Sequence, residues 1–562
     1  MATLPVKRLQ HGWRPTLSRQ DTIAFACLGV VLLLQTHMVL TRAINWDEFW
    51  YYAQVEQFAR GVLAGPLQTI HVRLFTWLTD LPGNGVDHII TGRVAMFAAE
   101  LATLVAIGGI SAHFTDRTTG VLCVLAYLGS LFVFQHGFSF RADPLAAGLS
   151  MTALVVLLKS RPSATGLAVF ALFAGLAGMV TIKTVLLAPA FAGVAWLRLA
   201  EADDRRRALL WVALCALGAG LVFAALYGLH AQALVAADSS ARAGMGTASS
   251  AADYALKLGL PAYFQYAINH AIKSPLQVLL MLAAPFAIAR SDLSSARKIA
   301  LAGMLASALV FFVYRNTLPY FYAFILPPIV CGTAVAMRAA AQRYSLAFVA
   351  VVLSIGPVVA WTREPPSPIE KQRLIVDAAD AIFRTPVVYF DFCAMLGTFH
   401  KANPFMTTWG MKAYREAGVP VMRQAMLAQV VPLVLAIEQE NYPTFREMLG
   451  SRGSSKYFLP EDAAALRDNY LPFWGPFWLA GKAVPPGGAV QHETFLVPGP
   501  YTVHDAPVRV DGQEYRPGDV LVLERGVHEL RTVRAGAARL IWGERLAPPA
   551  APAPSPPYWT DF

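Results

Sequence analysis

The apolar run AFACLGVVLLLQTHMVL (residues 24–40) is followed at once by TRAINWDEFWYY (residues 41–52). The first stretch is typical of a membrane-spanning helix, and where it ends the adjacent carboxylates Asp47 and Glu48 stand among aromatic residues. Two interpretations are open. Either the chain has simply reached water, or the two acids lie at the mouth of a site in the membrane surface. The rest of the sequence is needed to choose between them.

The composition separates the chain into two parts. Hydrophobic residues make up 56% of the 562 residues, charged residues only 15%, and the mean hydropathy is +0.46. An ordinary soluble domain carries about 25% charged residues. The deficit is confined to residues 21–361, where long apolar stretches alternate with short charged gaps. From residue 362 onward, charges and prolines return to ordinary density, so we expect a polytopic α-helical membrane region followed by a soluble domain.

The apolar stretches predict about eleven transmembrane helices, because a helix needs about 20 apolar residues to cross the hydrocarbon. The candidates are residues 21–41, 92–112, 119–136, 142–159, 165–182, 184–199, 208–229, 276–290, 299–315, 319–337 and 344–361. Pairs and clusters of basic residues fall in alternate loops, which places the N-terminal residues 1–20 in the cytoplasm. With an odd number of spans, residues 362–562 lie on the opposite side of the membrane.

The net charge of +10 is explained by these loops rather than by a nucleic-acid partner. Four of the five cysteines lie in apolar stretches, so neither a disulfide framework nor metal-type Cys/His spacing is present. No small-residue cleavage site follows the first apolar run, and we expect that run to be retained as a helix. The predicted location is the inner membrane of a bacterium, with a periplasmic C-terminal domain.

Ionisable side chains at the ends of the predicted spans are candidates for function, because charges near the hydrocarbon are costly. Arg141 and Asp143 begin one span, although a helix N-terminus alone favours an acid there. Lys183 lies at the junction of two other predicted spans, where its side chain could simply extend to the membrane–water interface. The remaining candidates on this side are His71, Arg73, Arg315, Tyr320 and Tyr322, of which the last three also fit an aromatic belt with a charged anchor.

Topology places all of these residues at the outer side of the membrane. Carboxylates and cations in one place suit a reaction on an anionic, lipid-borne substrate. The cations would hold a departing phosphate, and a carboxylate would take a proton from the attacking group.

Four segments in order resemble the GT-C superfamily of integral-membrane glycosyltransferases, in particular its protein O-mannosyltransferase-like and aminoarabinose-transferase-like branch. They are NWDEFWYY (45–52), RADP (141–144), GLAGMVTIKTVLLAPA (175–190) and RNTLPYFYAFILPP (315–328). The resemblance covers roughly residues 20–361. It implies transfer of a sugar from a polyprenyl-phosphate carrier to an acceptor at the non-cytoplasmic face, usually with inversion.

The resemblance also implies roles for individual residues. Asp47 matches the catalytic base, Glu48 its companion, and Asp143 a second acid near the sugar or the acceptor. Lys183 and Arg315 match positions that contact the donor or its phosphate. Mannosyltransferases carry a His-Pro-Pro stretch where this chain has IHVRLF (70–75), with His71 and Arg73 but no Pro-Pro. That departure weakens the case for a mannosyl donor or a protein acceptor.

Cofactors and partners follow from this chemistry. Cations can stabilise a leaving phosphate, so no cofactor is required, although Asp47, Glu48 and Asp143 could also hold a divalent cation. The expected partners are a polyprenyl-phosphate sugar donor, an envelope lipid, glycan or protein acceptor, and membrane lipids. The sugar, the acceptor and the choice between direct displacement and a glycosyl-enzyme intermediate stay open, with direct displacement favoured.

The C-terminal part contains several predicted units. Residues 362–490 include strand-like TPVVYFDF (385–392) and AQVVPLVLAI (428–437), which favour an α/β or α+β domain. The aromatic LPFWGPFWLAG (471–481) is a candidate for packing against the membrane region. Residues 491–546 alternate short strands with turns and predict a small β-sandwich-like module. Residues 547–562 form a Pro/Ala-rich tail, expected to be extended or disordered.

Two other classes of function remain open. A flippase for a lipid-linked sugar would be expected to show internal repeats and charges near the midplane, and neither is found. An oligosaccharide transferase with a diphosphate carrier is the nearest alternative enzyme.

Overall fold

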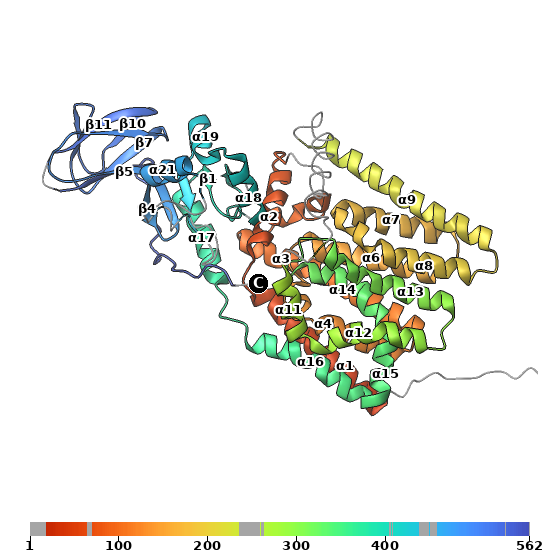
Figure 1. Ribbon diagram of the computed structural model, residues 1–562. Helices are drawn as coiled ribbons and strands as arrows, with labels where there is room; N and C mark the ends of the chain where they lie inside the picture. Colours follow the sequence, from red (N-terminus) through yellow and green to blue (C-terminus); the bar gives the residue numbers. More distant parts are fainter. Residues whose placement is uncertain are drawn as a thin grey trace, which may run out of the picture.

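The computed structural model describes residues 18–63, 70–234, 259, 263–403, 406, 408–437, 445, 449, 458–533 and 536–560. Helices make up the part up to residue 362, and a mixed α/β part follows at one end of them (Figure 1). The N-terminal segment up to residue 17 and most of residues 235–262 lie outside the described residues.

Each of the eleven predicted apolar stretches contains helix. The helical elements of this part are α1 (Arg19–Thr41), α2 (Trp46–Ala59), η1 (Ile70–Leu74), η2 (Thr76–Asp80), α3 (Gly85–Phe114), α4 (Arg117–Leu128), α5 (Leu131–His136), α6 (Ala142–Lys159), α7 (Ala164–Val180), η3 (Ile182–Leu187), α8 (Ala188–Ala200), α9 (Arg205–Gln232), α11 (Phe264–Lys273), α12 (Pro275–Arg290), α13 (Ser295–Ala306), η4 (Ser307–Phe312), α14 (Phe321–Gly332), α15 (Ala334–Tyr344) and α16 (Leu346–Thr362).

Six helical segments in the described part of the chain are long and apolar enough to cross a membrane, and up to eight if each of two bent pairs counts as one span. The bent pairs are α11 with α12, at 99°, and α14 with α15, at 67°. The shorter α4, α7 and α16 are apolar as well. The chain is therefore a multi-pass membrane protein, as predicted, and the number eleven stays a prediction.

Close packing between α3 and α6 fixes the helix that carries Asp143. A Cβ atom added at Gly148 of α6 would lie 2.7 Å from the carbonyl oxygen of Ala99 in α3. Real Cβ atoms do not approach a backbone oxygen so closely, so this approach requires glycine. The N-terminal end of α6 is thereby held close to α3, and α2 packs against the same end of α3.

The C-terminal part begins with helix α17 (Ile369–Ile382) and has two sheets. Its other elements are β1 (Val388–Phe390), β2 (His400–Lys401), α18 (Thr408–Ala417), α19 (Val421–Ala428), β3 (Leu433–Leu435), α21 (Pro460–Asn469), β4 (Tyr470–Trp474), β5 (Phe477–Val484), β6 (Gln491–Phe495), β7 (Gly499–His504), β8 (Val508–Val510), β9 (Gln513–Tyr515), β10 (Val520–Leu523), β11 (Gly526–Thr532) and β12 (Ala538–Trp542). A C-terminal sheet domain is confirmed.

One sheet passes through the boundary predicted at residue 490. Its strand order is β10-β7-β12-β5-β3-β1-β2, with β4 also paired to β5. Strand β5 pairs with β3 on one side and with β12 on the other, so it belongs to both predicted units. The second sheet, β6-β11-β8-β9, has four strands. The aromatic 471–481 segment forms β4 and β5 of the larger sheet, where the sequence suggested contact with the membrane region.

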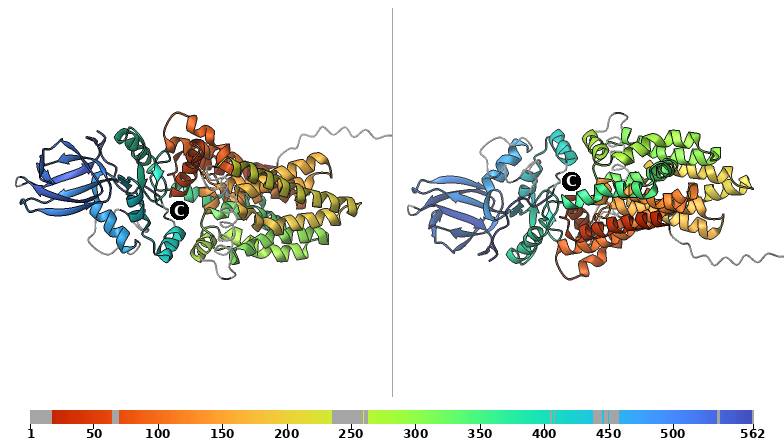
Figure 2. Two further views of the ribbon diagram at one scale, coloured as in Figure 1. Left: turned by 90° about the horizontal axis from the view of Figure 1, so that it is seen from above. Right: turned by 90° about the horizontal axis from the view of Figure 1, so that it is seen from below.

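The C-terminal tail is extended, and it returns to the helical part (Figures 1 and 2). Near its end Tyr558 and Trp559 are buried, with exposed fractions of 4% and 5%. The ring of Trp559 lies 6.2 Å from that of Trp46 and 5.7 Å from that of Phe49, both on α2. Its indole N–H donates to the carbonyl oxygen of Ile437 in the sheet domain. The tail therefore joins the two parts of the molecule.

Candidate active site

The acidic pair belongs to the start of α2, whereas the sequence suggested the end of the first span. Helix α1 ends at Thr41, and Asn45 caps α2: its side chain accepts a hydrogen bond from the backbone N–H of Asp47, at 2.9 Å. The carboxylate of Glu48 accepts one in return from the backbone N–H of Asn45, at 3.0 Å. This reciprocal capping box, with two acids in the first turn, is favoured by the helix dipole.

Glu48 faces away from any open space and is fully paired. Arg93 of α3 holds both carboxylate oxygens, with N···O distances of 2.7 and 2.6 Å, and the backbone N–H of Phe140 donates to one of them at 2.7 Å. Glu48 and Arg93 are each 1% exposed. Burial favours the protonated acid, but Arg93 holds the pKa of Glu48 below its usual range. This geometry gives Glu48 a structural role.

Asp47, by contrast, joins a row of alternating charges. Its carboxylate accepts from the guanidinium of Arg141, whose Nε lies 3.6 Å from Oδ2 of Asp143. The other oxygen of Asp143 accepts from the ammonium of Lys183. These four residues, here called the charged cluster, come from α2, the first turn of α6 and η3. The structure thus brings together three elements that lie far apart in the sequence.

Aromatic rings cover the charged cluster. The guanidinium of Arg141 lies 3.4 Å from the ring centroid of Tyr320 and 5.6 Å from that of Tyr51. The ammonium of Lys183 lies 5.8 Å from the same Tyr320 ring. Such cation–π contacts hold cations without neutralising them. Arg141 and Lys183 are therefore held both by the acids that they pair with and by the Tyr320 ring.

Two polar atoms of the cluster are buried without a hydrogen bond to any described residue, namely Nε of Arg141 and Oδ2 of Asp143. They face each other at 3.6 Å, slightly beyond hydrogen-bonding distance. Asp47 is the more accessible acid, with 12% of its side chain exposed against 1% for Asp143. A ligand entering the site therefore meets Asp47 first.

Arg315 lies in the segment between η4 and α14 that also carries Tyr320. It is half-buried, and among the described residues its side chain has no ion pair or hydrogen bond. Asn316 beside it donates to the hydroxyl of Tyr320 at 3.3 Å. Among the described residues, the Arg315 charge is thus unpaired, and it lies in the same segment as the Tyr320 ring that covers the charged cluster.

The other sequence candidates are not in direct contact with the cluster. Arg73 donates to Nδ1 of His230 at the end of α9, at 2.8 Å. His71 is 1% exposed and packs on Tyr51 with ring centroids 5.3 Å apart, and neither of its ring nitrogens has a hydrogen-bond partner among the residues that the structure describes. Tyr322 packs instead on Phe132 and His270.

Sequence reasoning missed Arg93, Glu100 and Tyr51. Arg93 and Glu100 lie inside the apolar stretch 92–112, and each is 1% exposed. The rule that charges within a span are functional candidates would have found both. Glu100 accepts a hydrogen bond from the side chain of Gln35, at 3.1 Å, and so links α3 to α1. Tyr51 carries no such signal, because aromatic residues are common at interfaces.

The C-terminal domain lies over the α2 end of the site. Phe392 packs on Trp46 with ring centroids 6.0 Å apart, and Arg60 donates to the carbonyl oxygens of Gly397 and Thr398, both at 2.6 Å. Just before the start of α2, the side chain of Gln372 makes two hydrogen bonds with the backbone of Ile44, at 3.0 and 2.9 Å. The sheet domain and the membrane part thus share α2.

Each of the three predicted acids is held by a basic side chain. In the described part of the chain, no group of three or more His, Cys, Asp or Glu side chains is placed to hold a metal ion. Asp47, Glu48 and Asp143 are each paired with a basic residue. The expectation that no cofactor is required stays a prediction.

The comparisons with known proteins bear on the fold. No family model and no curated protein sequence matches the chain. Among solved structures, the apo form of ArnT from Cupriavidus metallidurans aligns with a TM-score of 0.50 at 14% identity, over 71% of this chain and 89% of that one. The apo oligosaccharyltransferase of Archaeoglobus fulgidus aligns with a TM-score of 0.51 at 10% identity, over 90% and 76%.

ArnT bound to undecaprenyl phosphate aligns with a TM-score of 0.49 at 14% identity, over 70% of this chain and 89% of that one. The two apo structures, ArnT and the oligosaccharyltransferase, have the GT-C fold of membrane glycosyltransferases. The chain therefore has the GT-C fold, which is the fold that the resemblance of the four sequence segments implied.

Proposed function

We propose that this protein is a membrane glycosyltransferase that moves a sugar from a polyprenyl-phosphate carrier to an acceptor hydroxyl or amine. The observation that carries this proposal is the convergence of Asp47, Arg141, Asp143 and Lys183 into one charged cluster under Tyr320. The GT-C fold supports it. The site would face the periplasm of a bacterial inner membrane.

In the proposed reaction, the acceptor attacks the anomeric carbon of the sugar from the side of Asp47. A bond forms from the acceptor to that carbon, and the bond from the carbon to the phosphate oxygen breaks. Asp47 takes the acceptor proton, and the electron pair of the broken bond leaves with the polyprenyl phosphate. A single displacement of this kind inverts the anomeric centre.

The cations of the site suit the departing phosphate. Lys183 is 14% exposed at its side chain, and Arg315 is half-buried without a partner among the described residues. Either can meet the charge that develops on the leaving oxygen. Arg141 orients the Asp47 carboxylate, and Asp143 is placed to hold Lys183. ArnT, whose apo form shares the fold, has been solved with undecaprenyl phosphate, which agrees with a lipid phosphate as carrier.

A genetic experiment tests the activity and names its substrates. The gene is deleted in its host and restored as wild type, as Asp47→Asn or as Asp80→Asn, and the envelope lipids, polysaccharides and glycoproteins are compared by mass spectrometry. We expect one sugar to disappear from one acceptor in the deletion strain and in Asp47→Asn. Wild type and Asp80→Asn, a change of an exposed acid in η2, should restore it.

Full restoration by Asp47→Asn at normal protein level would contradict the proposed role of this acid. Loss of a flippase would instead leave undelivered carrier lipid on the cytoplasmic leaflet of the deletion strain. Purified protein in detergent separates the two classes, because transfer from carrier to acceptor needs no second compartment. A purified wild-type protein that transfers no sugar with the donor and acceptor so identified would argue against the enzyme.

A further inference from the structure

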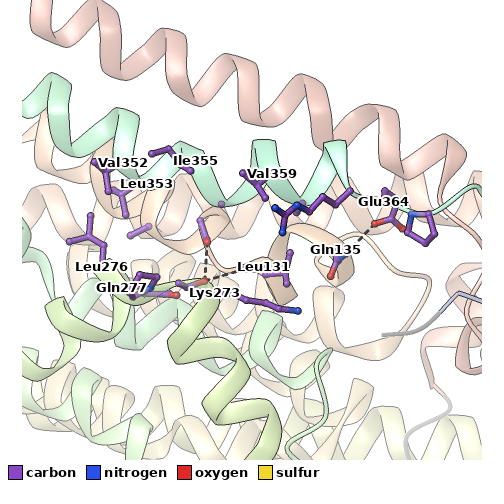
Figure 3. Close-up of a pocket in the computed structure, with 18 residues that line it drawn as sticks. Leu131, Gln135, Lys273, Leu276, Gln277, Val352, Leu353, Ile355, Val359 and Glu364 are labelled. Carbon is purple, nitrogen blue, oxygen red and sulfur yellow. Dashed lines mark hydrogen bonds between the residues drawn. The ribbon is translucent and has the colours of Figure 1, made fainter. Parts of the chain in front are cut away.

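A pocket of about 520 Å³ lies apart from the charged cluster, between the α4–α5 junction, the bend from α11 to α12, and α16 (Figure 3). Leu131 and Gln135 of α5 line it, and the chain continues from α5 to Arg141 of the cluster. Helix α5 therefore connects the two sites along the chain. The proposed sugar transfer does not use this pocket.

One end of the pocket is apolar and open to the side. Its walls there are Leu276, Val352, Leu353 and Ile355, gathered at one end of the view in Figure 3. Ile355 of α16 is 53% exposed, and Leu279 and Leu282 of α12 are also exposed. In a membrane-spanning part such side chains face lipid. A hydrocarbon chain could enter between α12 and α16 from the bilayer.

The other end of the pocket carries two basic side chains. Lys273 at the end of α11 and Arg363 after α16 are exposed, and neither side chain has an ion pair or hydrogen bond with the described residues. Glu364 at the same rim does not neutralise them, because it is taken by Gln135, at 3.1 Å, and by Arg42, at 3.5 Å. This end attracts an anion.

A buried amide in the pocket wall adds a third feature. Gln277 is 3% exposed and lies near His270, and within the described part of the chain neither its amide nitrogen nor its amide oxygen makes a hydrogen bond of normal geometry. It lines the pocket beside the apolar residues, away from Gln135 and Glu364 (Figure 3). A buried amide without a partner costs about 1–3 kcal/mol, so an occupant with a polar atom at this depth would be stabilised.

We propose that this pocket binds an anionic glycerophospholipid of the surrounding bilayer. Its phosphate would lie between Lys273 and Arg363, its ester carbonyl would accept from Gln277, and an acyl chain would follow α16. The ester matters for the choice of lipid, because a polyprenyl phosphate has no polar atom below its phosphate. The pocket is thus assigned to a bilayer lipid and not to the sugar carrier.

Lipid binding is measured on the purified full chain by native mass spectrometry, with phosphatidylglycerol and phosphatidylcholine as probes. We expect wild type to retain phosphatidylglycerol preferentially. The double variant Lys273→Gln, Arg363→Gln should lose affinity for it by roughly tenfold or more, since each basic residue contributes to anionic lipid binding. The matched control is Arg205→Gln, Arg290→Gln, which removes two exposed cations at other helix ends and should bind as wild type does.

A second variant tests the amide separately. Gln277→Leu keeps the size of the side chain, and we expect it to weaken phosphatidylglycerol binding while it raises the unfolding temperature of the lipid-free protein, because the unpaired amide is gone. Equal binding of the two lipids by wild type, or unchanged phosphatidylglycerol binding by the Lys273, Arg363 variant, would overturn the assignment. Displacement of phosphatidylglycerol by a lower concentration of undecaprenyl phosphate would overturn it too.

These measurements need no sugar transfer. The Asp47→Asn protein should bind phosphatidylglycerol as wild type does, so failure of the lipid assignment and failure of the proposed function are distinguishable.

Discussion

At the scale of single residues, Asp47 and Glu48 are neighbours in the chain with opposite environments. Glu48 points into α3 and is held by Arg93, whereas Asp47 points to the charged cluster and keeps 12% of its side chain exposed. One position along the first turn of α2 turns the side chain by about 100° around the helix axis. The two acids of one motif therefore have different tasks.

Glu48→Gln is expected to destabilise the protein. The change leaves the Arg93 charge buried without its partner, and breaking such a pair typically costs about 3–5 kcal/mol. The unfolding temperature and the yield of folded protein in detergent should both fall. Asp80→Asn is the matched control, because it makes the same kind of change at an exposed acid in η2, and its unfolding temperature should stay near that of wild type. Equal stability of both variants would contradict the structural role of Glu48.

The burial of His71 lets us predict how the free energy of unfolding depends on pH. Burial, with His230 nearby, lowers the pKa of His71 to about 4. In the unfolded chain the pKa is about 6.5. Between these two values the unfolded state binds a proton that the folded state does not, so the free energy of unfolding falls as the pH falls through this window.

The unfolding temperature of wild type should therefore drop between about pH 7 and pH 5. His71→Phe keeps the ring that packs on Tyr51 and removes the titrating group, so its drop should be smaller. An equal drop in both proteins would show that His71 does not titrate in this way.

At the scale of helices and strands, much of the fold could be predicted from the sequence. Long apolar runs interrupted by basic loops predict the membrane helices, and the cap Asn45 followed three residues later by Glu48 is a local signal for the start of α2. The bends between α11 and α12 and between α14 and α15 were missed, since hydropathy reports length and not direction.

The site was predictable only in part. Acids and cations at helix ends could be found one by one, because each is unusual near a membrane. The Glu48–Arg93 pair and the Tyr320 ring over Arg141 depend on contacts between helices that are distant in sequence. No local pattern encodes those contacts. His71 and Arg73 were included because of their loop, and Arg73 in fact contacts His230.

Gly148→Ala tests how the packing of α6 on α3 positions the site. The new Cβ would meet the Ala99 carbonyl oxygen at 2.7 Å, and both helices would have to separate. Overpacking of this kind costs about 1–3 kcal/mol, and the shift would move Asp143 and Arg141. We expect a lower unfolding temperature and lower transfer activity.

Gly29→Ala in α1 is the control, because a Cβ there meets nothing within 4 Å. That variant should be as stable as wild type or slightly more stable. Equal behaviour of the two alanine variants would mean that the α3–α6 contact does not position the site.

At the scale of the whole molecule, α2 lies between the membrane part and the sheet domain. Its first turn contributes Asp47 to the site, Arg60 after its last turn bonds to the loop of Gly397 and Thr398, and Trp46 and Phe49 receive Trp559 from the tail. The position of Asp47 therefore depends on the C-terminal domain, although that domain contributes no residue to the charged cluster.

Trp559→Ala should weaken the contact between the C-terminal tail and α2. Truncating a buried Trp typically costs about 3–5 kcal/mol, and here the loss falls on the contact between the two parts. We expect faster cleavage by added protease in the segment 363–368 and lower transfer activity, with normal membrane insertion. Trp196→Ala on α8, where the side chain is 50% exposed, is the control. Unchanged cleavage and activity in Trp559→Ala would show that the contact between the tail and α2 does not position the charged cluster.

The contact between Trp46 and Trp559 also sets an order of events during biosynthesis. More than five hundred residues separate the two rings in the chain. The ribosome makes Trp46 with the first membrane helix and Trp559 only after the entire sheet domain. Until then Trp46 and Phe49 lack their contact with Trp559, although Phe392 of the sheet domain can already pack on Trp46. The contact between α2 and Trp559 can therefore form only after the whole sheet domain has been made.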